Sequence, residues 1–238
     1  MAERLTLPQQ RALETRERIV AAARTTFAER GYEAATMDDI AAAAGASKGA
    51  LYHHFATKED LFRAMLDDHR SELDAFAQAV EAASSFRDLL DRLVGQWLDH
   101  YRSEPQFVSL SLEVRVQARR QPWFRAALGR HHDQLRGFLR GLVHAAREAG
   151  LVPADLDPQA HAVLLFGLLD GVCLQAGVTP AGVDLDDQRE PLRQGVERLL
   201  RIDERRAGDA AEMPRLRAAL QSLLAQRPGQ STGTQTST

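Results

Sequence analysis

The sequence predicts an all-α protein, and three observations support this prediction. Ala, Leu and Arg dominate the 238-residue chain, and aromatic residues make up only 6% of it; this composition favours helices. Apolar residues recur at helical spacing over long stretches, and no stretch shows the alternation typical of a half-buried strand. The hydrophobic share of 44% and the charged share of 26% are ordinary for a soluble globular protein.

The chain begins with one longer helical pattern followed by a short one. The first pattern covers about residues 9–30, and Gly31 is expected to end it. Thr36, with Asp39 three residues later, can cap the second helix. Gly45 can end that helix because glycine takes the left-handed conformation without a Cβ clash.

A third helix follows after a short turn. Ser47 can cap it, and it covers about residues 48–55. Two short helices joined by a turn that contains glycine are a helix-turn-helix, which the sequence therefore predicts. The chain has only two lysines, Lys48 and Lys58, and both stand at helix starts in this unit. A flexible ammonium there can reach a phosphate or a base edge; the alternative is two solvated surface lysines.

The charge of this segment does not mark it as a nucleic-acid binder. The formal net charge of the chain is −3, and residues 1–60 contain eight basic residues against nine acidic ones. The segment is therefore not a basic domain of the kind that usually surrounds phosphates. DNA binding would depend on local placement, with basic side chains and helix N-termini toward the phosphates and acids turned away.

Helical patterns continue toward the C-terminal end. A long helix is expected from Thr57 to about Val80, connecting the helix-turn-helix to the remainder of the chain. Its apolar stripe consists of Leu61, Phe62, Met65, Leu66, His69, Leu73, Phe76 and Val80. Further helices are expected over about residues 86–102, 106–120, 122–150, 158–178, 188–207 and 214–227.

Several short motifs of the N-terminal segment occur together in a specific order and spacing. They are residues 18–23 (RIVAAA), 27–32 (FAERGY), 45–49 (GASKG), 50–55 (ALYHHF) and 58–61 (KEDL). With these motifs the segment resembles the DNA-binding domain of TetR/AcrR-type transcriptional regulators, over about 50 contiguous residues. The resemblance implies an N-terminal three-helix helix-turn-helix domain and a C-terminal helical bundle for ligand binding and dimerisation. The expected ranges are residues 1–57 (with 1–8 flexible), residues 58–226, and a disordered tail over residues 227–238.

The resemblance also implies which residues face DNA, because the second short helix of the motif enters the major groove in this family. Carried over to this chain, the contacts are Thr36, Ser47, Lys48, Gly49, Ala50, Tyr52, His53 and Lys58. Lys48 could donate to guanine or to a phosphate, and Ala50 could touch a thymine methyl group. Gly49 would let the backbone approach closely. The remaining hydroxyl, imidazole and ammonium groups fit phosphate contacts, whereas Leu51 and Phe55 are expected in the core.

The second part of the chain contains residue types that suit a small-molecule site, but no ligand-binding motif. Pockets between helices are mostly apolar with a few placed polar groups. The candidates near inward faces are Trp97, Tyr101, Phe107, Phe124, Phe138, Phe166 and Asp170. Taken singly, each of them fits an ordinary core or surface position better than a ligand contact. The stretch 97–171 also resembles the C-terminal domain of one subgroup of the family, which does not identify a ligand.

The sequence contains no catalytic constellation, and neither a metal nor another cofactor is expected. His131 and His132 are adjacent, so they point about 100° apart on a helix and cannot easily bind one ion together. Cys173 lies in the most apolar segment, where a thiolate is disfavoured. This single cysteine excludes an internal disulfide and fits a reducing compartment. An apolar signal region and a run approaching about 18 apolar residues are both lacking, so a cytoplasmic protein without a membrane partner is expected.

Two helices near the C-terminal end are more apolar than one small bundle must bury: residues 158–178 and the helix near residues 188–207. Two such helices from each of two subunits would form a four-helix interface, as they do in the family. The alternative is that both are core helices of a single chain. An isologous dimer would place two recognition helices about 34–36 Å apart, one turn of DNA.

These features predict a DNA-binding transcriptional regulator rather than an enzyme. The expected form is a homodimeric repressor that a small-molecule effector releases from a palindromic, double-stranded operator. One alternative is the same fold acting as an activator or without an effector. Another is a helical enzyme or binding protein in which the helix-turn-helix is incidental. The effector, the operator and the regulated genes cannot be read from the sequence.

Overall fold

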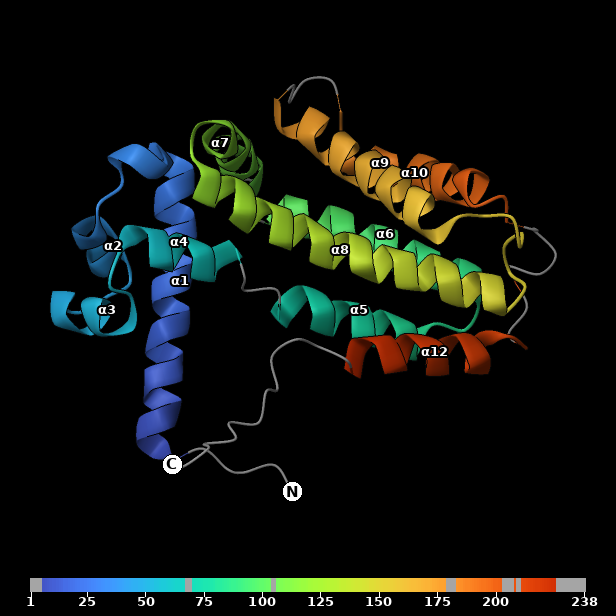
Figure 1. The fold of residues 1–238 in the computed structure, drawn as a ribbon, viewed down its shortest axis with the longest axis horizontal. Helices are drawn as coiled ribbons and strands as arrows, with labels where there is room; N and C mark the ends of the chain where they lie inside the picture. The colour runs from blue at the N-terminus through green and yellow to red at the C-terminus, as the bar shows by residue number, and fades with distance from the viewer. Residues whose placement is uncertain are drawn as a thin grey trace. The chain divides into compact units, whose positions relative to one another are not determined.

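The computed structural model describes residues 6–66, 70–103, 106–178, 183–202, 208 and 211–225. Every regular element in these residues is an α-helix, which confirms the predicted fold class. In chain order (Figure 1) they are α1 (Leu7–Ala34), α2 (Met37–Ala43), α3 (Lys48–His54), α4 (Lys58–Leu66), α5 (Arg70–Ala82), α6 (Phe86–Ser103), α7 (Gln106–Arg120), α8 (Pro122–Glu148), α9 (Pro158–Val178), α10 (Leu185–Leu199) and α12 (Met213–Ala225).

The long helix expected between residues 57 and 80 is present as α4 and α5. Residues 67–69, which join them, lie outside the described residues, as does the tail over residues 227–238. The connection between α4 and α5 as one continuous helix, and the disorder of the tail, therefore remain predictions.

The helix expected near residues 188–207 has different ends in the structure. It begins earlier because the Asp184 carboxylate accepts a hydrogen bond from the Asp186 amide at 2.9 Å and so caps α10. It ends at Leu199 because Arg201 adopts a left-handed φ of 49°. The amide of Ile202 then donates back to the Glu197 carbonyl at 3.1 Å, which closes the helix end.

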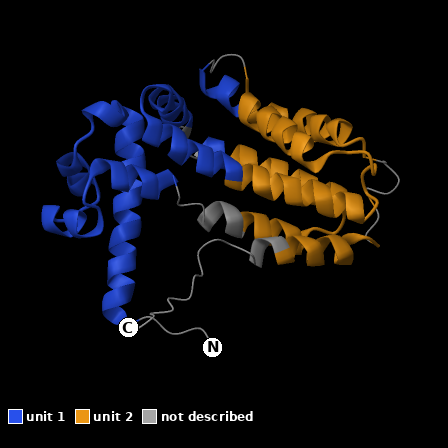
Figure 2. Ribbon diagram, in the orientation of Figure 1, with its two compact units in different colours: residues 1–69, 100–133, 173–180 blue, residues 70–99, 134–172, 181–238 orange. Residues whose placement is uncertain are grey.

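The chain divides into two compact units, each assembled from segments that are distant in sequence (Figure 2). Unit 1 comprises residues 1–69, 100–133 and 173–180, and unit 2 comprises residues 70–99, 134–172 and 181–238. Unit 1 thus combines the helix-turn-helix with α7 and the first half of α8. The functional division at residue 57 remains a prediction.

An aromatic cluster forms the centre of unit 1. The ring of Tyr32 lies 5.5 Å from that of Phe27, 5.2 Å from that of Phe62 and 4.7 Å from that of Phe124. Trp123 stacks on Phe124 with a ring separation of 3.9 Å. Burial of each such side chain stabilises the fold by about 1.5–3 kcal/mol. The first turn of α8 is therefore part of the hydrophobic core that supports α1, α2 and α4.

The interior of unit 2 is held by a ring stack and by a helix cap. Phe76 of α5 stacks on Phe138 of α8 with ring centroids 4.4 Å apart. The Arg217 guanidinium of α12 donates to the carbonyls of Val80 at 3.2 Å and of Ala83 at 2.9 Å, where α5 ends. These carbonyls have no partner within their own helix, so Arg217 satisfies them and fixes α12 against α5.

Helix α9 is much more apolar than its neighbours. An 18-residue window within Pro158–Val178 has a mean hydropathy of 1.6, yet only 28% of that window is buried within the chain. By length and composition alone it could cross a membrane, so the expectation that no segment approaches such a span was wrong. A core or interface helix of a soluble protein meets the same criterion. Val163, Leu164 and Val178 are about half exposed, at 49%, 52% and 59%.

Candidate nucleic-acid interface

The start of α2 is fixed by a reciprocal cap between Thr36 and Asp39. The Asp39 amide donates to Thr36 Oγ1 at 3.1 Å, and Asp39 Oδ2 accepts from the Thr36 amide at 3.1 Å and from its hydroxyl at 2.6 Å. These hydrogen bonds, and then the nearby Arg30 guanidinium, lower the pKa of the Asp39 carboxyl. Thr36 is exposed, as a phosphate contact requires, but its hydroxyl proton is engaged with Asp39.

The turn between α2 and α3 depends on one glycine. Gly45 has a left-handed φ of 58°, which glycine adopts without the penalty that a Cβ brings. The Gly45 amide donates to the Ala42 carbonyl at 3.1 Å and the Ala46 amide to the Ala41 carbonyl at 3.0 Å. This pair of hydrogen bonds is the Schellman motif, and it sets the direction in which α3 leaves the turn.

Helix α3 is short, amphipathic and anchored by two apolar side chains. Ser47 Oγ accepts from the Ala50 amide at 3.1 Å and caps the helix, as the sequence predicted. Leu51 is fully buried and Phe55 is 4% exposed. The opposite face carries the exposed residues Ser47, Lys48, Gly49, Tyr52 and His53, with Ala50 half-buried between the faces. The predicted contacts on α3 are thus exposed or half-buried, and α3 itself lies beside α2 (Figure 1).

Gly49 is free of packing constraints in the protein itself. A Cβ built on Gly49 would meet no heavy atom within 4 Å, and its φ is not in the left-handed region. The fold does not require glycine at this position. Its lack of a side chain instead leaves the backbone of α3 open to a partner from outside.

Lys48 forms an ion pair across the two helices of the motif. Its Nζ lies 2.9 Å from each carboxylate oxygen of Asp38, and both side chains are highly exposed, at 64% and 63%. The hydrogen bond to Asp38, and then its negative charge, raise the pKa of the Lys48 ammonium. Lys48 is thus fully charged and held in a defined direction on the outward face of α3.

Lys58 has partners within the protein that the sequence did not indicate. Its ammonium donates to the carbonyls of Tyr32 at 2.7 Å, Ala35 at 2.9 Å and Glu33 at 3.2 Å. It also lies 4.6 Å from the centroid of the Tyr32 ring. Carbonyls at a helix end lack partners within the helix, and Lys58 satisfies those at the end of α1. In the free protein the Lys58 ammonium is thus already engaged, and its contact with phosphate remains a prediction.

A histidine pair lies in the last turn of α3. His53 is exposed, whereas His54 is half-buried beside it, with the two rings 5.5 Å apart. Burial, and then the positive charges of His53 and Arg16, lower the pKa of the His54 imidazole. The Arg16 guanidinium lies 5.4 Å from the centroid of the Phe55 ring and so belongs to the same corner of unit 1.

The predicted effector contacts are divided between the two units. Trp97 and Phe166 meet edge to face in unit 2 with ring centroids 6.1 Å apart, and Asp170 lies one turn beyond Phe166 on α9. Phe138 is in the same unit but stacks on Phe76. Tyr101 lies in unit 1 and is buried, and the side chain of Phe107 lies outside the described residues.

Phe124 is a core residue of unit 1, and its predicted contact with an effector remains a prediction. Its ring lies 4.6 Å from that of Phe62, and the side chain is fully buried. Sequence spacing could not distinguish this position from a pocket wall, because both are inward positions of an amphipathic helix.

Sequence reasoning also missed Gln96, which lies next to Trp97 in α6. Its side-chain amide donates to the Ala75 carbonyl at 3.0 Å. Its Oε1 atom is buried without a hydrogen-bond partner in the described residues. The sequence did contain an indication of this, because Gln96 is a polar residue next to the inward-facing Trp97 of an amphipathic helix.

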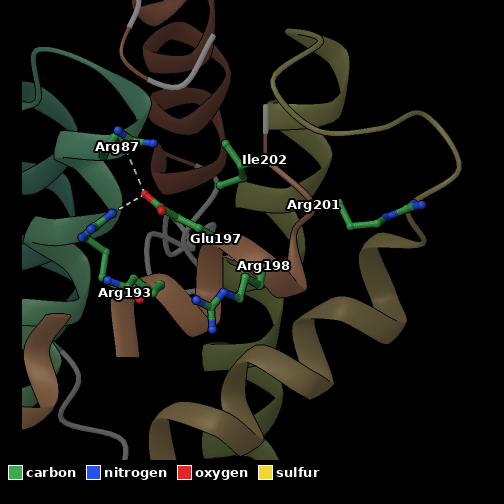
Figure 3. A pocket seen from close by; sticks show the side chains of 7 residues that line it. Arg87, Arg193, Glu197, Arg198, Arg201 and Ile202 are labelled. Atoms are coloured by element: carbon green, nitrogen blue, oxygen red, sulfur yellow. Dashed lines mark hydrogen bonds and ion pairs between the residues drawn. The ribbon is translucent and has the colours of Figure 1, made fainter. Parts of the chain in front are cut away.

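An arginine-lined pocket of about 420 Å³ lies in unit 2 and is chemically distinct from the aromatic residues (Figure 3). It is lined by Arg87, Arg193, Gln194, Glu197, Arg198, Arg201 and Ile202. Glu197 Oε1 accepts from Arg87 Nε at 3.0 Å and also from Arg193. The Glu197 carboxylate thus already takes the position that an anionic ligand of these two guanidinium groups would occupy. Within the described residues, no group of three or more His, Cys, Asp or Glu side chains could hold a metal ion.

Comparisons with known proteins agree with this geometry. The family described as "Bacterial regulatory proteins, tetR family" matches residues 19–65, and that described as "BetI-type transcriptional repressor, C-terminal" matches residues 86–201. The chain is 31% identical over 195 residues to the HTH-type transcriptional regulator TtgR of Pseudomonas putida, covering 74% of this chain and 87% of that protein. It is 32% identical over 157 residues to the HTH-type transcriptional repressor AcnR of Corynebacterium glutamicum, covering 66% and 79%. The structure of Salmonella enterica GusR matches with a TM-score of 0.63 and 27% identity, covering 84% of this chain and all of that one.

Proposed function

The chain belongs to the TetR family of bacterial regulatory proteins and is a DNA-binding transcriptional regulator, and from this premise we propose that α3 reads its operator in the major groove. The observation that carries the proposal is the division of α3 into two faces. Leu51 and Phe55 anchor one face, while Lys48, Gly49 and Tyr52 are presented on the other. A helix of this kind fits the major groove, where donors and acceptors distinguish all four base pairs.

A mobility-shift titration tests this proposal directly. The DNA is the region upstream of the protein's own gene, and the titration is repeated across salt concentrations. Lys48→Ala is expected to weaken binding by about 1–3 kcal/mol because it removes a base or phosphate contact. Arg215→Ala, which removes an exposed positive charge from unit 2, serves as the matched control. Wild-type protein that retains no DNA at low salt, or a Lys48→Ala variant with unchanged affinity, would contradict the proposal.

We further propose that the regulator is a homodimer formed through α9 and α10. The half-exposed apolar residues Val163 and Leu164 on α9 support this, because so apolar a helix needs a partner to cover it. An isologous dimer also provides two copies of α3 for a palindromic operator. Sedimentation of wild-type protein and of Leu164→Glu tests the interface. The variant is expected to be monomeric and to bind the operator more weakly; a variant that remains dimeric would exclude Leu164 from the interface.

We propose that the regulator is a repressor and that a small molecule bound in unit 2 releases it from DNA. The proximity of Trp97 to Phe166 and the buried Gln96 Oε1 support an amphipathic site there. The effector can shift binding only by its differential affinity for the two states. The chain has two tryptophans, so Trp123→Phe leaves Trp97 as the only indole reporter. A compound that changes Trp97 fluorescence and also releases operator DNA would be an effector, whereas one that does only the first would not.

We propose a cytoplasmic location, where such a regulator meets its operator. The proteins of this family are regulators and not enzymes, and we propose no catalytic activity for this chain.

A further inference from the structure

We propose that Asp38 is a specificity-determining residue of the DNA interface, which acts by positioning Lys48 and by opposing contact with the phosphate backbone. The inference rests on the proposed role of α3. The observation is that the one exposed lysine of the motif is bound by a carboxylate on the neighbouring helix, at 2.9 Å from each of its oxygens.

The ion pair joins two rigid supports rather than two flexible side chains of one helix. Asp38 lies in the first turn of α2, which the cap of Thr36 fixes, and Lys48 opens α3, which Ser47 caps. The Gly45 turn sets the angle between the two helices. Asp38 is not part of either cap, since the reciprocal bonds of α2 run through Asp39. The arrangement therefore fixes the direction of the ammonium without being needed to hold α2.

The hydrogen-bonding capacity of the pair suits a base edge. A lysine ammonium has three N–H donors, and Asp38 can engage two of them, which leaves one for guanine O6 or N7. The carboxylate retains lone pairs that can accept from the N4 amino group of cytosine. Donor and acceptor side by side match the major-groove edge of a G·C pair.

The same pair is poorly suited to non-specific binding. Non-specific affinity comes from phosphate contacts and from the counterions that they release. The pair of Lys48 and Asp38 brings no net positive charge to the phosphate backbone of DNA. In addition, the Asp38 carboxylate is repelled by phosphate. An exposed ion pair of this kind contributes little to the stability of the free protein. Its effect on DNA binding therefore depends on the negative charge and the position of Asp38. Asp38 thus lowers binding to wrong sequences more than binding to the operator.

The test compares wild-type protein with Asp38→Asn on two DNA duplexes of equal length. One is an operator selected from randomised duplexes with wild-type protein, and the other has random sequence. Asp38→Asn is expected to bind the random duplex about fivefold more tightly for each subunit near 0.1 M salt, because one repulsion between carboxylate and phosphate is lost in each subunit. The salt dependence on that duplex should steepen by about one slope unit for each subunit, because Lys48 gains a phosphate contact. Operator affinity should change by less than about twofold, so the specificity ratio falls.

Two further variants make the outcome decisive. Glu29→Gln removes the same charge from an exposed position of α1 and has no contact with Lys48. It should leave the specificity ratio unchanged. In a Lys48→Ala background, Asp38→Asn should change the ratio clearly less than it does with Lys48 present, because only the direct repulsion between the carboxylate and phosphate is then removed.

The inference is overturned if Asp38→Asn tightens both duplexes equally, as a general charge effect would. It is also overturned if the effect persists at full size without Lys48. If neither wild-type protein nor any variant binds DNA, the proposed function itself fails, which is a distinguishable result.

Discussion

Gly49 provides the sharpest test of how α3 meets DNA, because the same substitution should change stability and binding in opposite directions. In the free protein a Cβ at Gly49 meets nothing within 4 Å, and the backbone there is not left-handed. Alanine is favoured over glycine within a helix by about 0.5–1 kcal/mol. Gly49→Ala should therefore raise the free energy of unfolding by that amount, or the melting temperature by about 1–4 °C for a chain of this size.

Operator binding should fall in the same variant. If the outward face of α3 lies against base edges, the added methyl group enters a packed interface, where such overpacking costs about 1–3 kcal/mol. That corresponds to a loss of about tenfold or more in affinity. The measurements are thermal unfolding of the free protein and mobility-shift titration with the operator.

Gly129→Ala is the matched control for this pair of measurements. Gly129 also lies within a helix, in α8, and a Cβ there also meets nothing within 4 Å. It should stabilise the protein similarly and leave DNA binding unchanged. The reasoning is refuted if Gly49→Ala binds the operator as tightly as wild type, or if it destabilises the free protein.

Three other substitutions test the geometry elsewhere. Lys58→Met should lower the free energy of unfolding by about 2 kcal/mol in chemical denaturation, because it leaves the carbonyls at the end of α1 without a partner. The salt dependence of DNA binding should stay unchanged. A smaller salt dependence would instead show that Lys58 contacts a phosphate. Burial lowers the pKa of His54, so the unfolded state binds the proton at a higher pH than the folded state does, and stability falls as the pH drops below about 6.5. His54→Gln should make the stability less dependent on pH in this range. An unchanged pH profile of denaturation would exclude His54 as the cause. A Cβ at Gly177 would clash with the Val108 side chain, so Gly177→Ala should destabilise the protein by about 1–3 kcal/mol. Val108→Ala removes the two γ-methyl groups and should relieve part of that cost in a double-mutant cycle, and additive effects would refute the contact.

The near-neutral charge of the N-terminal segment has a structural explanation. Several acids that count against DNA binding in the sequence are engaged within unit 1. The Asp39 and Asp60 carboxylates accept hydrogen bonds from the Thr36 and Thr57 hydroxyls at helix starts, and Glu59 pairs with Arg63 on α4. Each carboxylate keeps its negative charge, but these contacts fix it at a helix start or beside Arg63.

The parts of the site that the sequence predicted correctly depend on short-range interactions. The caps of Thr36 and Ser47 involve atoms three residues apart, and the turn at Gly45 closes within six residues. Because backbone geometry and capping operate at this range, the positions of α2 and α3 follow from the order of residues alone. The buried positions of Leu51 and Phe55 follow from the same order, since they lie four apart on one helix.

The sequence by itself determined an all-helical chain, a helix-turn-helix at residues 36–55 and the outward face of α3. Periodicity, capping and the family motif all depend on residues that are close together in the chain. Only the tertiary structure decided the partners of side chains that meet across long separations. Lys58 satisfies carbonyls 23 to 26 positions away, and Phe124 joins Phe62 in one core. A long side chain can reach either solvent or the protein, and an inward helical position can line either a core or a pocket. The arrangement of neighbouring helices decides between them, and that arrangement depends on contacts that no local pattern records.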